Sequence, residues 1–168
     1  MRKLATTLLI AVMISGCSSP AVVDNLETYR GPLGAAVLPV VGTVHTANGD
    51  GQDPGQQIQR LIQQDMEASG LFAHVDRLTT AKAANEAEVI IAPVLLEVRW
   101  QGPGYRHGDI RLRITVTRKS DHQIILHKTY KGSCSDCKAP RGVTPVAGSM
   151  EKPLQQLQED LRRKLDER

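Results

Sequence analysis

The sequence predicts an α+β fold: a single domain with a mixed sheet of about five strands and helices mainly on one face. Three observations lead to this prediction. Short apolar, β-branched runs and helical patterns follow one another in the order β-α-β-α-β-β-β-α. Two segments, opening at Pro54 and at Ser149, place their apolar residues on a single helical stripe. The chain is also long enough to bury one hydrophobic core.

The first elements are a buried strand and an amphipathic helix. Residues 35–41, AAVLPVV, are a short apolar run typical of a buried strand, and residues 42–53 form a loop rich in Gly, Asn and Asp. Asp53 as N-cap and Pro54 at the first helical position open the helix, and Gly70 ends it. Its apolar stripe consists of Ile58, Leu61, Ile62 and Met66.

The middle of the chain predicts a short strand, a helix and a long strand. Residues 71–75 favour a strand, and residues 79–87 favour a helix with Thr79 or Thr80 as its cap. Residues 88–100, EVIIAPVLLEVRW, predict a central strand, because their first half is apolar on both faces.

The last third predicts a hairpin and a final helix. Residues 110–118 alternate between apolar and polar side chains, so that Arg111 and Arg113 face solvent, and residues 123–132 form the return strand. Residues 133–147 are expected to be a loop. The helix from Ser149 carries Pro153 in its first turn, where proline is tolerated. Its apolar stripe consists of Met150, Leu154, Leu157, Leu161 and Leu165.

The amino terminus has the layout of a secretory signal. Arg2 and Lys3 precede an apolar run over residues 4–14, which ends in the small residues Ser15 and Gly16. The run is too short to span a bilayer, which needs roughly 20 apolar residues. A short amino-terminal core helix is the alternative interpretation.

The ending Ile14-Ser15-Gly16-Cys17 resembles the lipobox of bacterial lipoproteins. The resemblance implies cleavage before Cys17 and covalent lipid, including palmitate, on that residue, with no other cofactor expected. Ser18 follows where an Asp would favour the inner membrane, so we expect an outer-membrane anchor facing the periplasm. The domains are then a signal peptide (1–16), a lipidated tether (17–34) and a periplasmic α/β domain (35–168).

Composition argues against a nucleic-acid-binding protein. Removal of Arg2 and Lys3 with the signal lowers the formal charge from +3 to +1, and aromatic residues are only 3% of the chain. Binding of single-stranded nucleic acid uses stacking aromatics in a positive groove.

Cys134 and Cys137 are expected to form a disulfide, because the periplasm is oxidising. Their spacing also matches a redox Cys-x-x-Cys motif, which needs its first Cys at a helix amino terminus. Gly132 and Pro140 predict a loop there instead, which favours a structural bridge. A redox site and half of a metal site are the alternatives. The five histidines lack His-x-x-x-His spacing, so no metal site is expected.

No catalytic constellation is evident. The sequence lacks Gly-x-Ser-x-Gly, and the Gly-rich loop over 42–53 lacks the lysine of a phosphate-binding loop. Asp109 and Asp121 flank one strand at opposite ends, which separates them too far for paired-acid chemistry. The chain is therefore expected not to be an enzyme.

A basic surface near the end of the long strand is the candidate binding site. Arg111 and Arg113 share the outer face of one strand, and an aromatic pair with further arginines lies at the neighbouring loop. An ordinary solvated sheet face, with Trp100 capping the core, is the alternative. The candidate partner-binding residues are Arg99, Trp100, Tyr105, Arg106, Arg111 and Arg113.

The order of elements and several short phrases resemble a known group. They are an early VLPV strand, a helix ending ASGLF, the strands EVIIAPVLLEV and HQIILHKTYKG, and a terminal amphipathic helix. Over residues 35–167 the chain resembles the small envelope lipoproteins that share the fold of the TolB amino-terminal domain. They include activators of penicillin-binding proteins and the lipoproteins of curli and Pel polysaccharide export. The short tether differs from the long linkers of the activators.

The resemblance implies a non-enzymatic lipoprotein that binds an envelope protein partner in an assembly or export system. One alternative is a thiol-redox or metal-binding accessory protein that uses Cys134 and Cys137. The other is a ring-forming export component, which would be a homo-oligomer.

Overall fold

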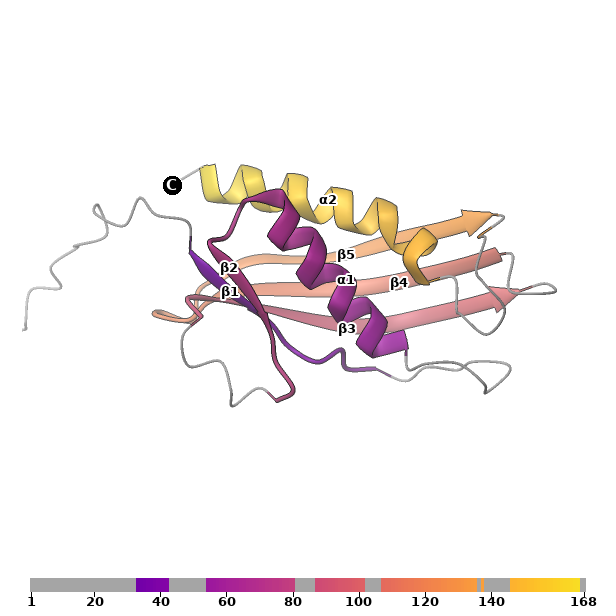
Figure 1. Cartoon of the computed structure of the whole chain (residues 1–168), viewed down its shortest axis with the longest axis horizontal. Helices are drawn as coiled ribbons and strands as arrows, with labels where there is room; N and C mark the ends of the chain where they lie inside the picture. Colours follow the sequence, from indigo (N-terminus) through magenta and orange to yellow (C-terminus); the bar gives the residue numbers. More distant parts are fainter. Residues whose placement is uncertain are drawn as a thin grey trace, which may run out of the picture. The chain divides into compact units, whose positions relative to one another are not determined.

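Five strands and two helices make up the part of the chain that the computed structural model describes, which is residues 33–42, 54–80, 87–101, 107–135, 137 and 146–166. The strands form one mixed sheet in the order β2-β1-β3-β4-β5, and both helices lie on one face of it (Figure 1). The predicted α+β class is confirmed. The elements are β1 (Gly34–Val37), α1 (Pro54–Ser69), β2 (His74–Arg77), β3 (Val89–Gln101), β4 (His107–Arg118), β5 (Ile124–Ser135) and α2 (Val146–Asp166).

β1 is shorter than the predicted strand over 35–41. It pairs in parallel with β2 and β3 and ends at Val37, after which only Val41 makes a further bridge, to Val94. Pro39 lies between them and lacks the N–H that a continuous strand would need.

α1 has the predicted bounds and connects the parallel strands β1 and β2. Gly70 follows it with φ +67°, a left-handed conformation that glycine adopts without steric cost. Gln59, buried in α1, donates hydrogen bonds to the carbonyls of Val37 and Leu78 at 2.9 and 2.8 Å. These bonds attach the helix to the ends of β1 and β2. The predicted Asp53 cap lies outside the described residues.

The connection between β2 and β3 differs from the prediction. β2 covers His74–Arg77 rather than 71–75, and Phe72 is buried in the turn before it. Thr79 and Thr80, predicted as candidate caps, form a bend, and Ala87 is not helical, so the predicted helix over 79–87 does not reach its last residue; residues 81–86 lie outside the description. Backbone bonds to β1 hold both sides of this connection, from Leu78 to Val37 and from Glu88 to Gly34.

The described element order is therefore β-α-β-β-β-β-α. β3, β4 and β5 form an antiparallel meander, as predicted; β4 and β5 are longer than the sequence suggested, and β3 is shifted by one residue. The alternation in β4 is confirmed. Arg111 and Arg113 are exposed, and the buried residues are Ile110, Leu112, Ile114 and Val116.

α2 begins at Val146, before the predicted Ser149, so Pro153 lies in the helix interior and not in its first turn. Gly132 of β5 faces this segment of the helix. A Cβ at Gly132 would collide with the carbonyl oxygen of Ser149 and the ring of Pro153. Because Pro153 has no N–H, the Ser149 carbonyl has no intrahelical donor at that position. The absence of a side chain at Gly132 thus lets α2 pack directly on the backbone of β5.

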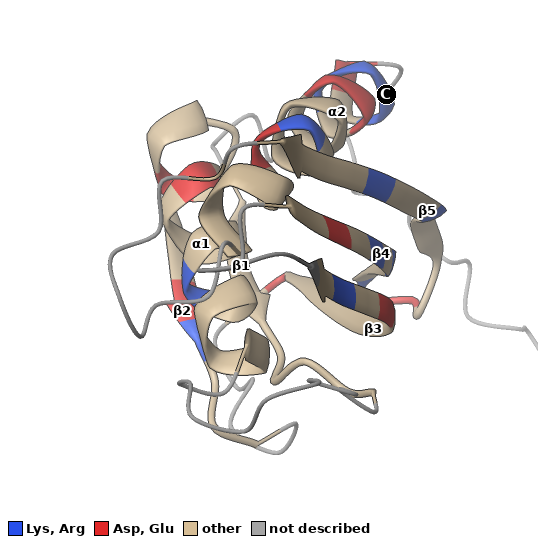
Figure 2. Ribbon diagram, turned by 90° about the vertical axis from the view of Figure 1, so that its right-hand side faces the viewer, with Lys and Arg blue, Asp and Glu red and all other residues tan. Residues whose placement is uncertain are grey.

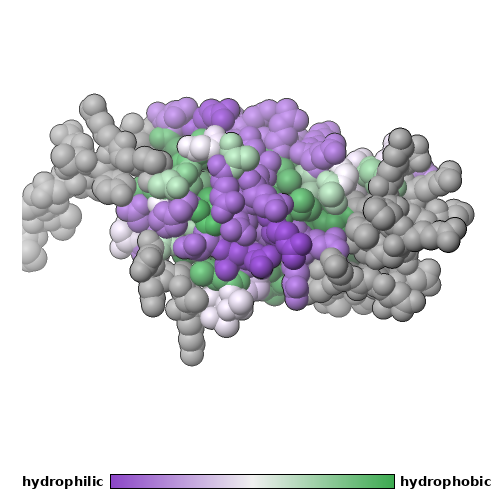
Figure 3. All heavy atoms as spheres, in the orientation of Figure 1, coloured by the Kyte–Doolittle hydropathy of each residue, from purple (hydrophilic) through white to green (hydrophobic). Residues whose placement is uncertain are grey.

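The core lies between the two helices and the sheet, and the surface seen from the helix side is mostly hydrophilic (Figure 3). α1 contributes the fully buried Ile58, Ile62 and Met66, and α2 contributes Met150, Leu157 and Leu161. The predicted stripes therefore face the core, although Leu165 at the end of the α2 stripe is only partly buried.

One polar cluster fixes α2 to β5. Asp160 of α2 is 6% exposed and accepts hydrogen bonds from Lys128 Nζ at 2.6 Å and Tyr130 Oη at 2.9 Å. Arg163 donates to its other oxygen at 2.8 Å. Burial raises the pKa of Tyr130, and the bond to Asp160 and its charge raise it further. Burial alone would also raise the pKa of Asp160, but the bonds from Lys128 and Tyr130 and the nearby cations hold it below its ordinary value.

The first prediction concerns this cluster. Asp160→Asn should lower the free energy of unfolding by about 1–3 kcal/mol at pH 7, because Tyr130, Lys128 and Arg163 lose a charged acceptor. A carboxyl with a lowered native pKa stabilises the fold above its unfolded pKa and loses this effect as the pH falls through its native value. The difference between wild type and variant in urea unfolding should therefore shrink below about pH 4.

Asp121→Asn is the matched control, because Asp121 also pairs with an arginine but is exposed in a turn. It should change stability by less than about 0.5 kcal/mol. Equal losses for the two variants, or a difference that grows at acid pH, would contradict the role of Asp160.

Candidate functional site

The sheet face opposite the helices carries charged side chains from β3, β4 and β5. Seen along the strands, the helices lie on one side of the sheet, and basic and acidic bands lie on the three strands (Figure 2). This face includes the exposed residues Arg99, Arg111 and Arg113. Among the described elements no helix packs against this side.

A β-bulge in β3 determines which side chains reach this face. The pairing with β4 shifts register between Leu95 and Glu97. Before the shift, Ile91 and Leu95 are buried; after it, Val98 and Trp100 are buried. One extra residue thus reverses the alternation, so that Glu97 and Arg99 point away from the core.

Glu97 connects two arginines on the open face. Its carboxylate accepts from Arg99 Nη2 at 2.5 Å and from Arg111 Nη2 at 3.1 Å. The register places Glu97 opposite Arg111, and Lys131 of β5 opposite Arg111 on the other side. Directly opposed side chains in a sheet lie within interaction distance, so these three residues form a row across the strands.

A hollow of about 410 Å³ lies over this row and reaches α2. Four of its lining side chains are cationic and two are anionic, which gives a net charge of +2. The charged lining residues are Glu97, Arg99, Asp109, Arg111, Lys131 and Lys152. Such a surface can hold an anionic group through several charge-assisted hydrogen bonds.

The candidate partner-binding residues predicted from the sequence do not all lie in the hollow. Arg99 and Arg111 line the hollow, and Arg113 lies on the same face beyond it. Trp100 is 7% exposed and packs in the core over Gly108, so it is not available as a surface anchor. Its Nε1 has no hydrogen-bond partner among the described residues. Tyr105 and Arg106 lie outside the described residues.

Sequence reasoning did not propose Glu97, Lys131 and Lys152 for the site. For Glu97 the sequence gives only a partial signal. Residues 89–96 are apolar at odd and even positions alike, so the alternation that begins at Glu97 does not show that a bulge precedes it. Lys152 has no such signal, because only the packing of α2 on β5 brings it near Lys131.

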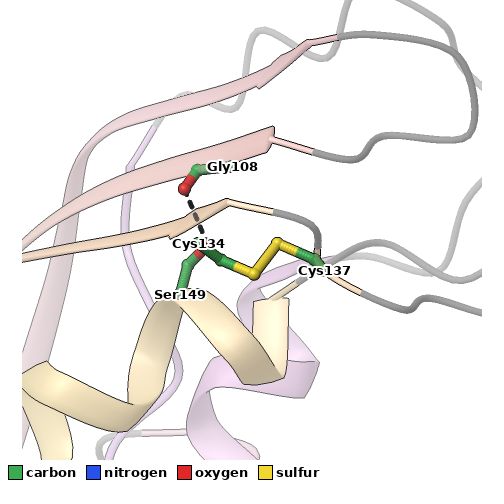
Figure 4. Close-up of a disulfide and its surroundings, with 4 residues drawn as sticks. All are labelled: Gly108, Cys134, Cys137 and Ser149. Carbon is green, nitrogen blue, oxygen red and sulfur yellow. Dashed lines mark hydrogen bonds between the residues drawn. A yellow bond between two sulfur atoms is a disulfide. The ribbon is translucent and has the colours of Figure 1, made fainter.

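The structure joins Cys134 and Cys137 in a disulfide with a Cα–Cα distance of 5.6 Å. Cys134 belongs to β5, so the loop predicted to begin at residue 133 begins later. The bridge lies beside the first turn of α2 (Figure 4). A Cβ at Gly148 in this turn would approach the Cys134 sulfur to 2.8 Å. Beside it, Ser149 Oγ donates to the Gly108 carbonyl at 3.0 Å. Two contacts therefore hold the start of α2 to the sheet.

Within the described ranges, no three His, Cys, Asp or Glu residues lie close enough together to hold a metal ion. His127 hydrogen-bonds Thr115 at 2.9 Å across β4 and β5. Asp109 lies in β4, whereas Asp121 is in the turn after it and pairs with Arg118. Neither helix in the described part is long and apolar enough to cross a membrane.

No family model and no curated protein matches the sequence. Several solved structures share the fold. PelC from Paraburkholderia phytofirmans, a dodecamer, is 12% identical over 76% of this chain and 87% of its own, with a TM-score of 0.57. The hypothetical protein CT253 from Chlamydia trachomatis is 12% identical, and the match covers 80% of this chain and 96% of CT253, with a TM-score of 0.51. XCC0632 from Xanthomonas campestris is 15% identical over 77% and 81%, with a TM-score of 0.50.

At these identities the similarity concerns the fold. PelC is the Pel export lipoprotein of the group that the sequence phrases resemble. That resemblance is therefore confirmed at the level of the fold, without identifying a particular member.

The second prediction concerns the disulfide. Replacement of Cys134 and Cys137 by Ser should lower the free energy of unfolding by no more than about 2 kcal/mol, because the closed loop is short. Urea unfolding measures the loss, and the reduced wild-type protein should match the double variant. A loss of function in envelopes beyond what this destabilisation explains would instead support the redox alternative.

Proposed function

We propose that this chain is a non-enzymatic outer-membrane lipoprotein whose periplasmic domain binds a protein partner in an envelope assembly or export system. The anchor is lipid on Cys17, supported by the lipobox-like sequence that ends there. Two or more acyl chains hold a protein on a membrane far better than one.

The open sheet face carries the proposal of partner binding. Arg99, Arg111 and Arg113 stand on it from two strands, and no described helix covers them. Clustered arginines are common in binding surfaces, because the guanidinium group offers several donors and is weakly hydrated. An acidic surface on the partner is the complement of this face.

A homo-oligomer is a second candidate. It is supported by the shared fold with PelC, which forms a dodecamer. A ring-forming export component would use the same anchor and could present the open face to a further partner.

The third prediction tests the anchor. Cys17→Ala should abolish metabolic incorporation of palmitate and move the protein out of the outer-membrane fraction, because the acceptor for lipid is gone. Fractionation of envelopes with immunodetection measures this. Ser18→Ala is the matched control and should still be labelled and sediment with the outer membrane. A Cys17→Ala protein that still carries palmitate would exclude this anchor.

The fourth prediction tests the face. The double variant Arg111→Glu, Arg113→Glu should lose at least about tenfold of the partner captured by crosslinking in intact envelopes. The control is Arg60→Glu, Arg162→Glu, which makes the same change in charge at exposed residues of α1 and α2. Similar capture by both double variants would show that the open face is not the binding surface.

A further inference from the structure

Glu97 forms ion pairs with both arginines of the hollow, so that they already have a carboxylate partner within the protein. It accepts from both Arg99 and Arg111, and its side chain is 31% exposed while theirs are 66% and 44% exposed. Ion pairs that remain in contact with water contribute little, because solvent screens them. An incoming carboxylate can therefore take the place of Glu97 at Arg111 without leaving a buried charge unpaired.

Two further cations in the hollow have no such occupant. Lys131 and Lys152 line it, and among the described residues neither forms an ion pair. An anionic ligand at Arg111 would lie beside Lys131, its cross-strand neighbour, and Lys152 approaches from α2. The hollow is thus suited to more than one negative charge.

The hollow also opens at the edge of the sheet. Lys131, Gly132 and Ser133 of β5 line it, and in the described sheet β5 pairs only with β4. The outer edge of a strand presents backbone N–H and C=O groups at the spacing of another extended chain. A peptide can use these groups, whereas an acidic glycan would use only the charged side chains.

We propose that the hollow binds an extended acidic segment of a protein partner. The segment adds to the free edge of β5, and its carboxylates reach Lys131, Lys152 and Arg111, from which they displace Glu97. This inference rests on the proposed partner-binding function and specifies the chemistry of the partner.

The test uses the full-length protein in detergent and a fluorescent peptide of four Glu-Thr repeats, whose carboxylates lie on one face when it is extended. Binding is measured by anisotropy. Glu97→Gln should tighten binding about two- to fivefold, because it removes the competing carboxylate. Arg111→Glu should weaken binding at least about tenfold.

Arg60→Glu is the matched control, because Arg60 is an exposed arginine of α1, on the other side of the sheet, and does not line the hollow. It should change binding by less than about twofold at 0.15 M salt, where charges beyond the Debye length of about 8 Å are screened. Unchanged or weaker binding by Glu97→Gln, or equal losses for Arg111→Glu and Arg60→Glu, would overturn the assignment. Glu97→Gln changes no buried residue, so its unfolding midpoint should match wild type.

Two further probes test the occupant. The same peptide with every backbone nitrogen methylated should bind at least about tenfold more weakly, because neither of its edges can then donate hydrogen bonds to β5. Equal binding by the methylated peptide would exclude strand addition. An oligogalacturonate of equal charge should bind more weakly than the peptide. If the oligogalacturonate binds more tightly and responds in the same way to Glu97→Gln, the occupant of the hollow is an acidic glycan and not a peptide.

Failure here is distinguishable from failure of the proposed function. If the peptide does not respond to Glu97→Gln but the double arginine variant still loses its partner in envelopes, the open face binds the partner without this hollow. If the peptide responds as expected but partner capture is unchanged in that variant, the hollow binds acidic peptides and the envelope function is wrong.

Discussion

The bulge in β3 is the constraint on which the site depends. A strand alternates its side chains strictly, so a residue cannot change face without a break in register. The single extra residue between Leu95 and Glu97 lets Val98 and Trp100 complete the core while Glu97 and Arg99 turn outward. The same local feature therefore closes the end of the core and builds the charged row opposite it.

The packing of α2 on β5 sets the other boundary of the site. Gly132 allows the helix to contact the strand backbone, and Asp160 and the disulfide fix the helix at two separate places. Because α2 covers only one face of β5, the opposite face stays open and Lys152 can reach the hollow from the side. The contacts that stabilise the fold and the proposed binding surface thus lie on different faces of β5.

The sequence predicted those elements whose signals are local. The stripe of α1, the glycine after it and the alternation in β4 depend on residues a few positions apart, and all three are confirmed. The residues over 79–87 have helical propensity, yet Ala87 is not helical, and Leu78 and Glu88, which flank the segment, bond to β1 through contacts that local propensity does not reveal. The hollow could not be predicted, since it requires the register of three strands and the position of α2.

Weak ion pairs are adequate for the proposed role if the domain has the proposed lipid anchor. A domain held at a membrane meets a partner in the same envelope at high effective concentration, so each contact needs little intrinsic affinity. The formal charge without the signal is only +1, whereas the hollow carries +2, so the attraction is concentrated at one place on the surface. Glu97 is already counted in this charge, and it lowers the attraction by pairing with two of the arginines. The selectivity of the proposed site then comes from the geometry of β5. An acidic chain that cannot extend along the strand edge binds only through charge–charge interactions, which solvent and salt screen.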